Sequence, residues 1–412
     1  MTCLLVQRPR LILIGVGCRG LTGEQAGMLG RCRLMVGDPR HLALVEKMAA
    51  EKLAITPLAP ALERIRLALA NGDVGVLASG DPLFFGIGRR LLKEFGEARL
   101  VVLPALSTMQ EACARFKLPW DDLETVSLHG RKALHAPGLL LAGEKTFVFT
   151  DRHNTPAHLA RQLVDYLELI GADDLLARCR VHVAENLGTE AERLFSGTLL
   201  EAAGQDFAEL NVLIVTRPGA EDGNGPVFGI TEEEIAHSRG LITKDEVRAV
   251  TLHALRLPST GVLWDLGAGS GSISVAAARL HPGLTVFAVD CTAEAFANVK
   301  RNIRRFGCYN VVPVLGEATA VLSTLPDPDR VFIGGSGGRL GEIIAQTAGR
   351  LPAGGRLVIN GITGKTVAEA PECMAAHGLR VELTRMQIER TTYPETEPGK
   401  VLNPITVMTG RK

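Results

Sequence analysis

The sequence predicts an α/β protein built from two unlike domains. Three observations support this prediction: a length of 412 residues, apolar strand-like runs that alternate with helical stretches, and two glycine loops about 250 residues apart. One hydrophobic core stops growing at about 250–300 residues, so this length favours two domains. Alternating strands and helices are typical of α/β proteins.

The first half of the chain carries seven predicted strands. Helical segments lie between them, and one of these, Thr155–Leu169, opens with the Thr-Pro pair that commonly starts a helix. The predicted strands are Leu11–Val16, Leu34–Val36, Val74–Ala78, Leu100–Leu103, Thr146–Thr150, Arg180–Ala184 and Asn211–Val215.

A breaker-rich segment separates the two halves. Residues 216–226 contain three glycines, two prolines, two acids and an asparagine, a composition typical of a solvated linker. We therefore expect one domain over residues 1–216, a linker over 217–228 and a second domain over 229–412. The predicted strands of the second domain are Gly261–Asp265, Thr285–Val289, Val311–Val314, Arg330–Ile333 and Gly355–Ile359.

Composition excludes several classes of function. The chain is 46% apolar and 22% charged with zero formal net charge, whereas a nucleic-acid binder needs a basic surface. The eight cysteines form no Cys-x-x-Cys pair, so we expect no metal site. No apolar run reaches the roughly 18 residues of a membrane span, and the N-terminus lacks the pattern of a signal peptide. A soluble cytoplasmic protein is the expectation.

The second glycine loop has the features of a nucleoside site. Gly267, Gly269 and Gly271 follow a predicted strand, but Ser272 stands where a dinucleotide fold requires its third glycine. Asp290 ends the next strand, where a carboxylate can accept ribose hydroxyls. The alternative from these residues alone is a generic Rossmann-like domain with an idle or NAD-binding loop.

This combination resembles the class I S-adenosylmethionine-dependent methyltransferases. Four further segments are similar to the decarboxylating methyltransferases of the corrinoid pathway: Gly229–Glu232, Leu241–Arg248, Ile333–Gly338 and Leu402–Ile405. The resemblance implies that the substrate lies at Gly334–Gly338, with Gly335, Ser336, Gly337 and Arg339 as the catalytic candidates. The implied cofactor contacts are Thr243, Gly267, Ala268, Gly269, Ser270, Gly271, Asp290 and Ala318.

The first glycine loop is a weaker signal. Gly15, Gly17 and Gly20 satisfy the dinucleotide pattern after a strand, and Asp38 follows at the end of the next strand. Against that interpretation, the segment 21–33 contains three more glycines, which make a poor packing helix.

Other segments of the first half resemble the class III tetrapyrrole methylases, a two-lobed fold, and more closely the branch that methylates precorrin at carbon 5. These segments are Ala78–Gly86, Pro104–Thr108, Phe149–Pro156 and Glu185–Gly188. Cys18 departs from many relatives, which have proline there, and we expect it to be a packing residue. The implied cofactor contacts are Ser79, Gly80, Asp81, Phe84, Ser107, Thr108, Thr150 and Leu187.

Together the halves resemble successive parts of a fused decarboxylating precorrin methyltransferase. The implied reaction uses two S-adenosylmethionine molecules, one per domain, on a precorrin-6B type tetrapyrrole. It adds methyls at carbons 5 and 15 and releases carbon dioxide from the ring C acetate, which gives a precorrin-8 of cobalamin biosynthesis. Alternatives are a single-activity enzyme with one domain as a binding module, a nucleic-acid methyltransferase and an NAD-dependent oxidoreductase.

A substrate with many carboxylates predicts basic residues in each cleft. In the second half the candidates are Arg339 and the Lys300–Arg305 helix face, for which a solvated face is the alternative. In the first half they are Arg19, Arg131-Lys132 and Arg152-His153, where His153 is a turn residue or a general acid. We expect a small-molecule tetrapyrrole as the partner, no nucleic acid, no membrane, and a homo-oligomer.

Overall fold

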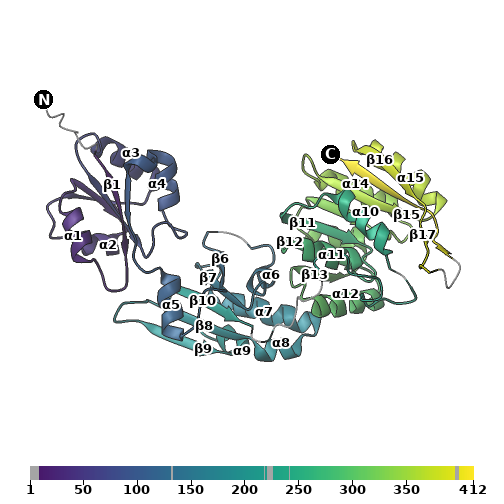
Figure 1. Cartoon of the computed structure of the whole chain (residues 1–412), viewed down its shortest axis with the longest axis horizontal. Coiled ribbons are helices and arrows are strands. Elements are labelled where there is room, and N and C mark those ends of the chain that lie inside the picture. Colours follow the sequence, from purple (N-terminus) through teal and green to yellow (C-terminus); the bar gives the residue numbers. More distant parts are fainter. Residues whose placement is uncertain (1–8, 131–132, 218, 220–225, 241, 395–398) are drawn as a thin grey trace.

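The computed structural model describes residues 9–130, 133–217, 219, 226–240, 242–394 and 399–412. Three sheet-centred units follow one another along the chain: two lobes in the first half and one larger unit in the second. Figure 1 shows lobe 2 between lobe 1 and the C-terminal unit. Most of the predicted linker falls outside the described residues.

Lobe 1 is a five-stranded parallel sheet with the order β3-β2-β4-β1-β5. Alternate residues of β1 enter two different apolar clusters, Leu11 and Leu13 on one face and Ile12 and Ile14 on the other. Helices therefore cover both faces, as a parallel sheet requires. The elements are β1 (Leu11–Val16), α1 (Gly23–Leu29), β2 (Leu34–Gly37), α2 (Pro39–Ala43), β3 (Glu51–Ala54), α3 (Leu58–Ala68), β4 (Val74–Ser79), α4 (Gly88–Phe95), η1 (Glu97–Arg99) and β5 (Leu100–Leu103).

Lobe 2 is a five-stranded mixed sheet with the order β6-β7-β10-β8-β9, in which only β6 and β7 run parallel. Helix α7 begins after Thr155, whose side chain accepts a hydrogen bond from His158, and ends at Gly171 in the left-handed conformation. The elements are α5 (Thr108–Phe116), β6 (Glu124–Ser127), α6 (Ala136–Leu140), β7 (Lys145–Phe149), α7 (Pro156–Ile170), α8 (Asp173–Arg178), β8 (Arg180–Glu185), β9 (Arg193–Gly197), α9 (Leu199–Ala203) and β10 (Asn211–Thr216).

The C-terminal unit is a seven-stranded sheet with the order β13-β12-β11-β14-β15-β19-β16. Six strands run in the same direction, and β19 is inserted antiparallel to them between β15 and β16. The elements are α10 (Asp245–Leu255), β11 (Thr260–Leu266), α11 (Ser272–Leu280), β12 (Gly283–Asp290), α12 (Ala293–Phe306), β13 (Val311–Leu315), α13 (Ala318–Val321), η2 (Leu322–Thr324), β14 (Arg330–Ile333), α14 (Leu340–Arg350), β15 (Arg356–Gly361), α15 (Gly364–Ala376), β16 (Arg380–Met386), β17 (Glu389–Arg390), β18 (Lys400–Val401) and β19 (Ile405–Arg411).

All twelve predicted strands are present, with ends shifted by two residues at most. The sequence prediction missed the edge strands β3, β9 and β16, whose side chains are mostly exposed and give a weak apolar signal. It also missed β19, a buried inner strand. The glycine-rich segment 21–33 forms only a seven-residue helix, α1, held by a capping box between Thr22 and Gln25.

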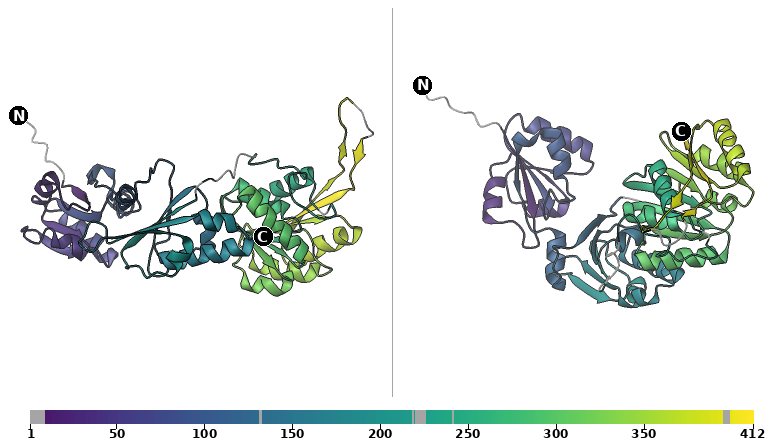
Figure 2. Two further views of the ribbon diagram at one scale, coloured as in Figure 1. Left: turned by 90° about the horizontal axis from the view of Figure 1, so that it is seen from below. Right: turned by 45° about the vertical axis from the view of Figure 1, so that its right-hand side comes forward.

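Lobe 2 and the C-terminal unit share one continuous apolar cluster, which contains Leu163 and Leu167 of α7 together with Ile303 of α12. The hydroxyl of Tyr166 donates to the carbonyl of Val311 at 2.8 Å, and Nε2 of His135 donates to the carbonyl of Tyr309 at 2.9 Å. Arg304 donates to the carbonyl of Ile170. The interface is therefore buried and specific, and both views in Figure 2 show the two units side by side.

Candidate active sites

The first glycine loop is shaped by backbone crowding. A Cβ added to Gly15 would lie 2.0 Å from the carbonyl oxygen of Gly80 and 2.5 Å from the amide of Ala105. Gly17 to Gly20 then form a tight turn closed by a 3.0 Å hydrogen bond, and α1 starts only at Gly23. A dinucleotide phosphate site needs a helix N-terminus directly after the loop. The first glycine loop is not followed directly by one.

Asp38 also has a role other than the one a dinucleotide fold would give it. It is the N-cap of α2, where its carboxylate accepts from the backbone amide of Arg40 at 3.1 Å. The turn geometry and this cap both support the interpretation that the first loop is not a dinucleotide site.

A large cleft lies between the two lobes, with a volume of about 1640 Å³. We call it the interlobe cleft. The first glycine loop forms one wall, through Gly17, Cys18 and Gly20. Of the predicted cofactor residues, the cleft is lined by Ser79, Gly80, Thr108, Thr150 and Leu187.

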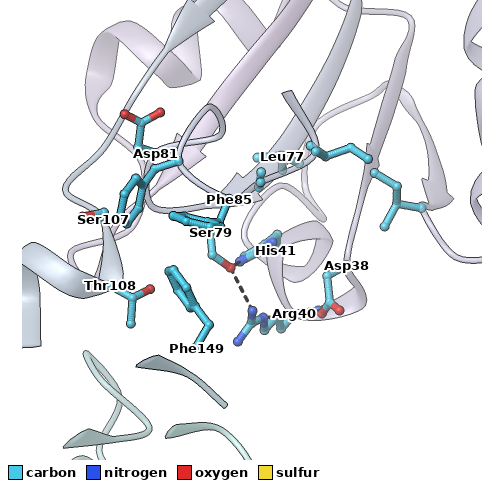
Figure 3. A pocket seen from close by; sticks show the side chains of 15 residues that line it. Asp38, Arg40, His41, Leu77, Ser79, Asp81, Phe85, Ser107, Thr108 and Phe149 are labelled. Carbon is cyan, nitrogen blue, oxygen red and sulfur yellow. Dashed lines mark hydrogen bonds and ion pairs between the residues drawn. The ribbon is translucent and has the colours of Figure 1, made fainter. Parts of the chain in front are cut away.

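A smaller cavity of about 270 Å³ adjoins the cleft, and we call it the Ser79 cavity (Figure 3). Its lining includes five predicted cofactor residues: Ser79, Asp81, Phe84, Ser107 and Thr108. The two segments that carry them meet because Gly80 has a positive φ of 59° and packs on Ser107, where a Cβ would lie 2.9 Å from the Ser107 Cα. The structure thus brings all eight N-terminal predictions to one pair of connected cavities.

Several of these side chains are engaged within the protein. Ser107 is 4% exposed, and its hydroxyl caps α5 by accepting from the amide of Gln110 at 3.2 Å. Thr150 donates to Asn211 Oδ1 at 2.7 Å. Contacts from Ser107 and Thr150 to a ligand would therefore come mainly from their backbone atoms.

Aromatic rings form the wall between the two cavities. Phe85 is 54% exposed and holds a left-handed backbone with φ of 52°, which is unusual for a bulky residue. Its ring lies 5.1 Å from that of Phe84 and 5.5 Å from that of Phe149. Phe85 lines both the Ser79 cavity and the interlobe cleft.

Of the predicted basic residues, Arg152 and His153 line the interlobe cleft, whereas Arg131-Lys132 lie outside the described residues. Both cleft residues belong to a turn in which the Asp151 carboxylate accepts from the amides of Asn154, Gly130 and His153, and these hydrogen bonds lower the pKa of Asp151 to about 2. His153 is a residue of this turn, as the structural alternative expected.

The second glycine loop is open where a ligand would approach. Gly267, Gly269 and Gly271 all have positive φ, between 56° and 73°, and a Cβ on Gly269 would meet nothing within 4 Å. Gly267 packs directly on the backbone of Gly335, where a Cβ would lie 2.4 Å from the Gly335 carbonyl oxygen. The two glycine-rich segments of this domain, at the ends of β11 and β14, are therefore in contact.

Asp290 is fixed at the same edge of the sheet. Its Oδ2 accepts from the amide of Gly269 at 2.9 Å, and its Oδ1 accepts from the amide and hydroxyl of Thr292, both at 3.0 Å. A carboxylate has about four acceptor positions, so Oδ2 keeps one for a ribose hydroxyl. Ala318 is nearby, because the amide of Gly316 donates to the carbonyl of Asp290 at 2.9 Å.

The other predicted residues of this domain are less directly joined to the loop. Thr243 precedes α10, which packs on α11, and its carbonyl accepts from Arg248 at 3.2 Å. Arg339 is the N-cap residue of α14 and pairs with Glu342 at 2.7 Å. Arg304, from the predicted basic helix face, lies instead at the interface with lobe 2.

The sequence prediction missed a buried acid below the second loop. Asp265 is fully buried, and its Oδ2 accepts from the hydroxyl and amide of Ser274. Burial raises the pKa of Asp265 to about 7, and the hydrogen bonds from Ser274 oppose that shift. Asp265 thus ties the start of α11 to the end of β11 and holds the loop between them.

Arg40, His41 and Arg89 were also missed, although all three line the interlobe cleft. Arg40 donates to the hydroxyl of Ser79 at 2.8 Å. The only available signal was the position of Arg40 and His41 directly after the strand that Asp38 ends, which is the edge where ligands bind in open α/β sheets.

Among the residues described, no three His, Cys, Asp or Glu side chains cluster so that they could hold a metal ion. No helix within the described ranges is long and apolar enough to cross a membrane.

Two families of known proteins match successive parts of the chain. Residues 10–203 match the tetrapyrrole (corrin/porphyrin) methylases, and residues 234–396 match the precorrin methyltransferase domain. Two glycine-lined sites and these two matches define the class of protein: an S-adenosylmethionine-dependent methyltransferase.

Individual relatives narrow the class. The chain is 32% identical to the precorrin-6Y C(5,15)-methyltransferase (decarboxylating) of Sinorhizobium sp. over 86% of this chain and 85% of that protein. It is 34% identical to the protein of the same name from Mycobacterium tuberculosis (strain CDC 1551 / Oshkosh) over 92% and 93%. A probable cobalt-precorrin-6B C(15)-methyltransferase (decarboxylating) from Pyrobaculum calidifontis is 41% identical over 165 residues, 39% of this chain and 84% of that protein. The chain belongs to the family of decarboxylating precorrin-6Y C5,15-methyltransferases.

Proposed function

We propose that this chain methylates a precorrin-6B type tetrapyrrole at carbons 5 and 15, with one site for each position. The N-terminal domain methylates carbon 5, and the C-terminal domain methylates carbon 15 and releases the ring C acetate carboxyl as carbon dioxide. The product is a precorrin-8 of cobalamin biosynthesis. The observation that carries this proposal is the presence of two separately built sites, one in each family-matched domain.

The length of a single-activity relative supports the division of labour. The Pyrobaculum protein, named for carbon 15 alone, aligns with 165 residues of this chain. The precorrin methyltransferase domain spans a similar length, residues 234–396. This similarity favours the C-terminal domain as the carbon 15 and decarboxylation unit.

In the C-terminal domain the geometry fits S-adenosylmethionine. The open left-handed loop admits the nucleoside, Asp290 accepts a ribose hydroxyl, and Ala318 presents its backbone to the adenine. When bound, the cofactor supplies an electrophilic methyl group on a sulfonium sulfur. Gly335, Ser336 and Gly337 then leave room for the tetrapyrrole beside the loop, and Arg339 can exchange its exposed partner Glu342 for a substrate carboxylate.

In the N-terminal domain the predicted cofactor residues would hold the second cofactor in the part of the interlobe cleft next to the Ser79 cavity, and the rest of the cleft would hold the macrocycle. A meso carbon of a reduced tetrapyrrole is already enamine-like, so the protein mainly aligns the reacting atoms and excludes water. The aromatic wall of Phe84, Phe85 and Phe149 offers an apolar surface for this alignment.

A stoichiometry measurement tests the two-site proposal. Calorimetry with S-adenosylhomocysteine should give two sites per chain for the wild type and one for full-length Asp290→Ala, because the alanine leaves the ribose and the Gly269 amide without an acceptor. The variant should also lose carbon 15 methylation and carbon dioxide release.

The matched control is Asp327→Ala, a carboxylate of the same domain that is 73% exposed and pairs with Arg350 on the surface. It should keep both sites. A wild-type chain that binds only one cofactor would favour the alternative, in which one domain serves as a binding module.

We also propose that copies of the chain assemble through the far edge of the C-terminal sheet. Strand β16 ends the sheet there with Leu383 52% exposed, and the neighbouring β17–β18 ribbon carries Val401 63% exposed. Figure 2 shows this ribbon projecting from the body of the domain. Among the described residues β16 pairs with β19 alone, so its other edge is free, and a free strand edge can pair with a second copy even though Arg380 and Glu382 lie along it.

A further inference from the structure

The wall between the Ser79 cavity and the interlobe cleft carries a cluster of polar side chains with unused hydrogen-bonding capacity. Arg40, His41 and Ser79 are its members, and all three line both cavities. Figure 3 shows them together at the side of the Ser79 cavity away from Asp81.

Arg40 is held in place but not saturated. One Nη donates to Ser79 Oγ at 2.8 Å, and Nε lies 3.6 Å from Asp38 Oδ1, which is an ion pair without a direct hydrogen bond. The side chain is 49% exposed. A guanidinium has five N–H donors in a planar fork that matches a carboxylate, so the fork retains donors for a ligand.

His41 is the second polar residue of this cluster. The residue is only 8% exposed, its Nε2 lies 3.3 Å from Ser79 Oγ, and its buried Nδ1 has no hydrogen-bond partner among the described residues. This atom has almost no accessible surface, so His41 contributes to the cluster through Nε2, which lies beside the Ser79 hydroxyl that also accepts from Arg40. Burial lowers the pKa of His41, the neighbouring Arg40 lowers it further, and Asp38 opposes the shift.

The dimensions of the two cavities indicate what can enter each. Pockets for drug-sized ligands span about 300–1,000 Å³. The Ser79 cavity, at about 270 Å³, admits a side arm, whereas the cleft, at about 1640 Å³, admits a macrocycle. A carboxylate on a short flexible arm therefore fits the wall between them.

We propose that Arg40, His41 and Ser79 form a carboxylate-binding subsite of the N-terminal active site. The carboxylate comes from an acetate or propionate arm of the tetrapyrrole or from the amino-acid end of the methyl donor. The exposed ion pair between Arg40 and Asp38 contributes about 0–1 kcal/mol. A carboxylate that replaces Asp38 therefore costs the protein little stability. This inference rests on the proposed function, which supplies both carboxylate sources.

The test compares full-length Arg40→Ala, Arg40→Lys and wild type, with kcat and KM measured separately for methyl transfer to positions 5 and 15. A hydrogen-bonded charged contact contributes about 1.5–3 kcal/mol, so Arg40→Ala should raise one KM for position 5 by about 10- to 100-fold. Transfer at position 15 should be unchanged, and Arg40→Lys should recover part of the loss because it keeps the charge.

Which KM rises identifies the source. A higher KM for the tetrapyrrole indicates a substrate arm, and a higher KM for S-adenosylmethionine indicates the amino-acid end of the cofactor. The matched control is Arg90→Ala, an arginine of the same lobe that is 52% exposed and pairs with Glu94 on the surface. It should leave both KM values unchanged.

Two results would overturn the subsite: unchanged KM values at position 5 in Arg40→Ala, or a fall in kcat alone. If the wild type transfers no methyl to position 5, the proposed function is wrong. Binding then decides the subsite, because Arg40→Ala must still weaken the affinity for uroporphyrin III or for S-adenosylhomocysteine relative to Arg90→Ala.

Discussion

Asp38 and Asp290 lie at similar sequence distances from the two glycine loops but make different hydrogen bonds in the structure. Each lies at the end of the strand that follows a glycine loop: Asp38 comes directly after β2, 18 residues after Gly20, and Asp290 is the last residue of β12, 19 residues after Gly271. Asp38 caps the short helix α2 next to it, whereas Asp290 accepts from the amide of Gly269 within the loop itself. Sequence spacing alone cannot distinguish the roles of Asp38 and Asp290. The difference depends on which backbone amide lies next to each carboxylate in the folded chain.

At the same scale, His135 makes the domain interface sensitive to pH. Burial lowers its pKa from 6.5 to about 4, although its hydrogen bond to the carbonyl of Tyr309 opposes the shift. The unfolded chain therefore takes up a proton first as the pH falls. Stability from the neutral ring is complete above pH 6.5 and is lost progressively toward pH 4, by about 3 kcal/mol in total.

Urea unfolding at a series of pH values measures this loss. His135→Gln keeps a donor for the Tyr309 carbonyl but cannot titrate, so its unfolding free energy should fall less between pH 6.5 and 4. His158→Gln, on the exposed side of α7, should retain the full wild-type pH dependence. Identical slopes for His135→Gln and wild type would contradict the prediction.

Among the elements, the two glycine loops need glycine for two different physical reasons, which are backbone crowding and a left-handed backbone. In the first loop Gly15 is required because the backbones of Gly80 and Ala105 crowd it, while in the second loop Gly269 faces open space with a left-handed backbone. The pattern of glycines predicted a special backbone in both places. Whether that backbone faces a neighbour or a ligand depends on strands far away in the sequence.

This crowding gives an element-scale prediction. Gly15→Ala should destabilise the protein by about 2 kcal/mol or more, because the new methyl group would overlap backbone atoms that cannot move independently. Gly27→Ala, in the exposed face of α1 with nothing within 4 Å, should be neutral or stabilising by up to about 1 kcal/mol. Chemical denaturation of both variants provides the comparison, and equal effects would contradict the packing argument.

For the whole molecule, the edge of the C-terminal sheet that faces the rest of the chain determines how far the second glycine loop lies from that interface. A cavity of about 420 Å³ between the units is lined by Thr260, Gly283 and Asn310, at the amino ends of β11, β12 and β13. The second glycine loop follows β11 at the opposite edge of the sheet. The seven residues of β11 put these edges about 23 Å apart.

That orientation predicts that the singly methylated intermediate leaves one site before it reaches the other. The lag before doubly methylated product appears should then lengthen about tenfold when the enzyme is diluted tenfold, because capture from solution depends on site concentration. Rapid-quench time courses with mass detection measure the lag. A lag that does not change with enzyme concentration would show direct transfer instead.

The sequence by itself determined the α/β class, twelve of the strands, and a resemblance that the family comparisons confirmed; its site residues remain predictions. Strong apolar periodicity and short glycine motifs involve residues that are close in the sequence, so they can be recognised without knowledge of the tertiary structure. Only the tertiary structure decided that Gly15 is a packing glycine, that Arg304 belongs to the interface, and that Arg40 and His41 border the cofactor residues. These outcomes depend on contacts between residues tens to hundreds of positions apart, which local pattern does not encode.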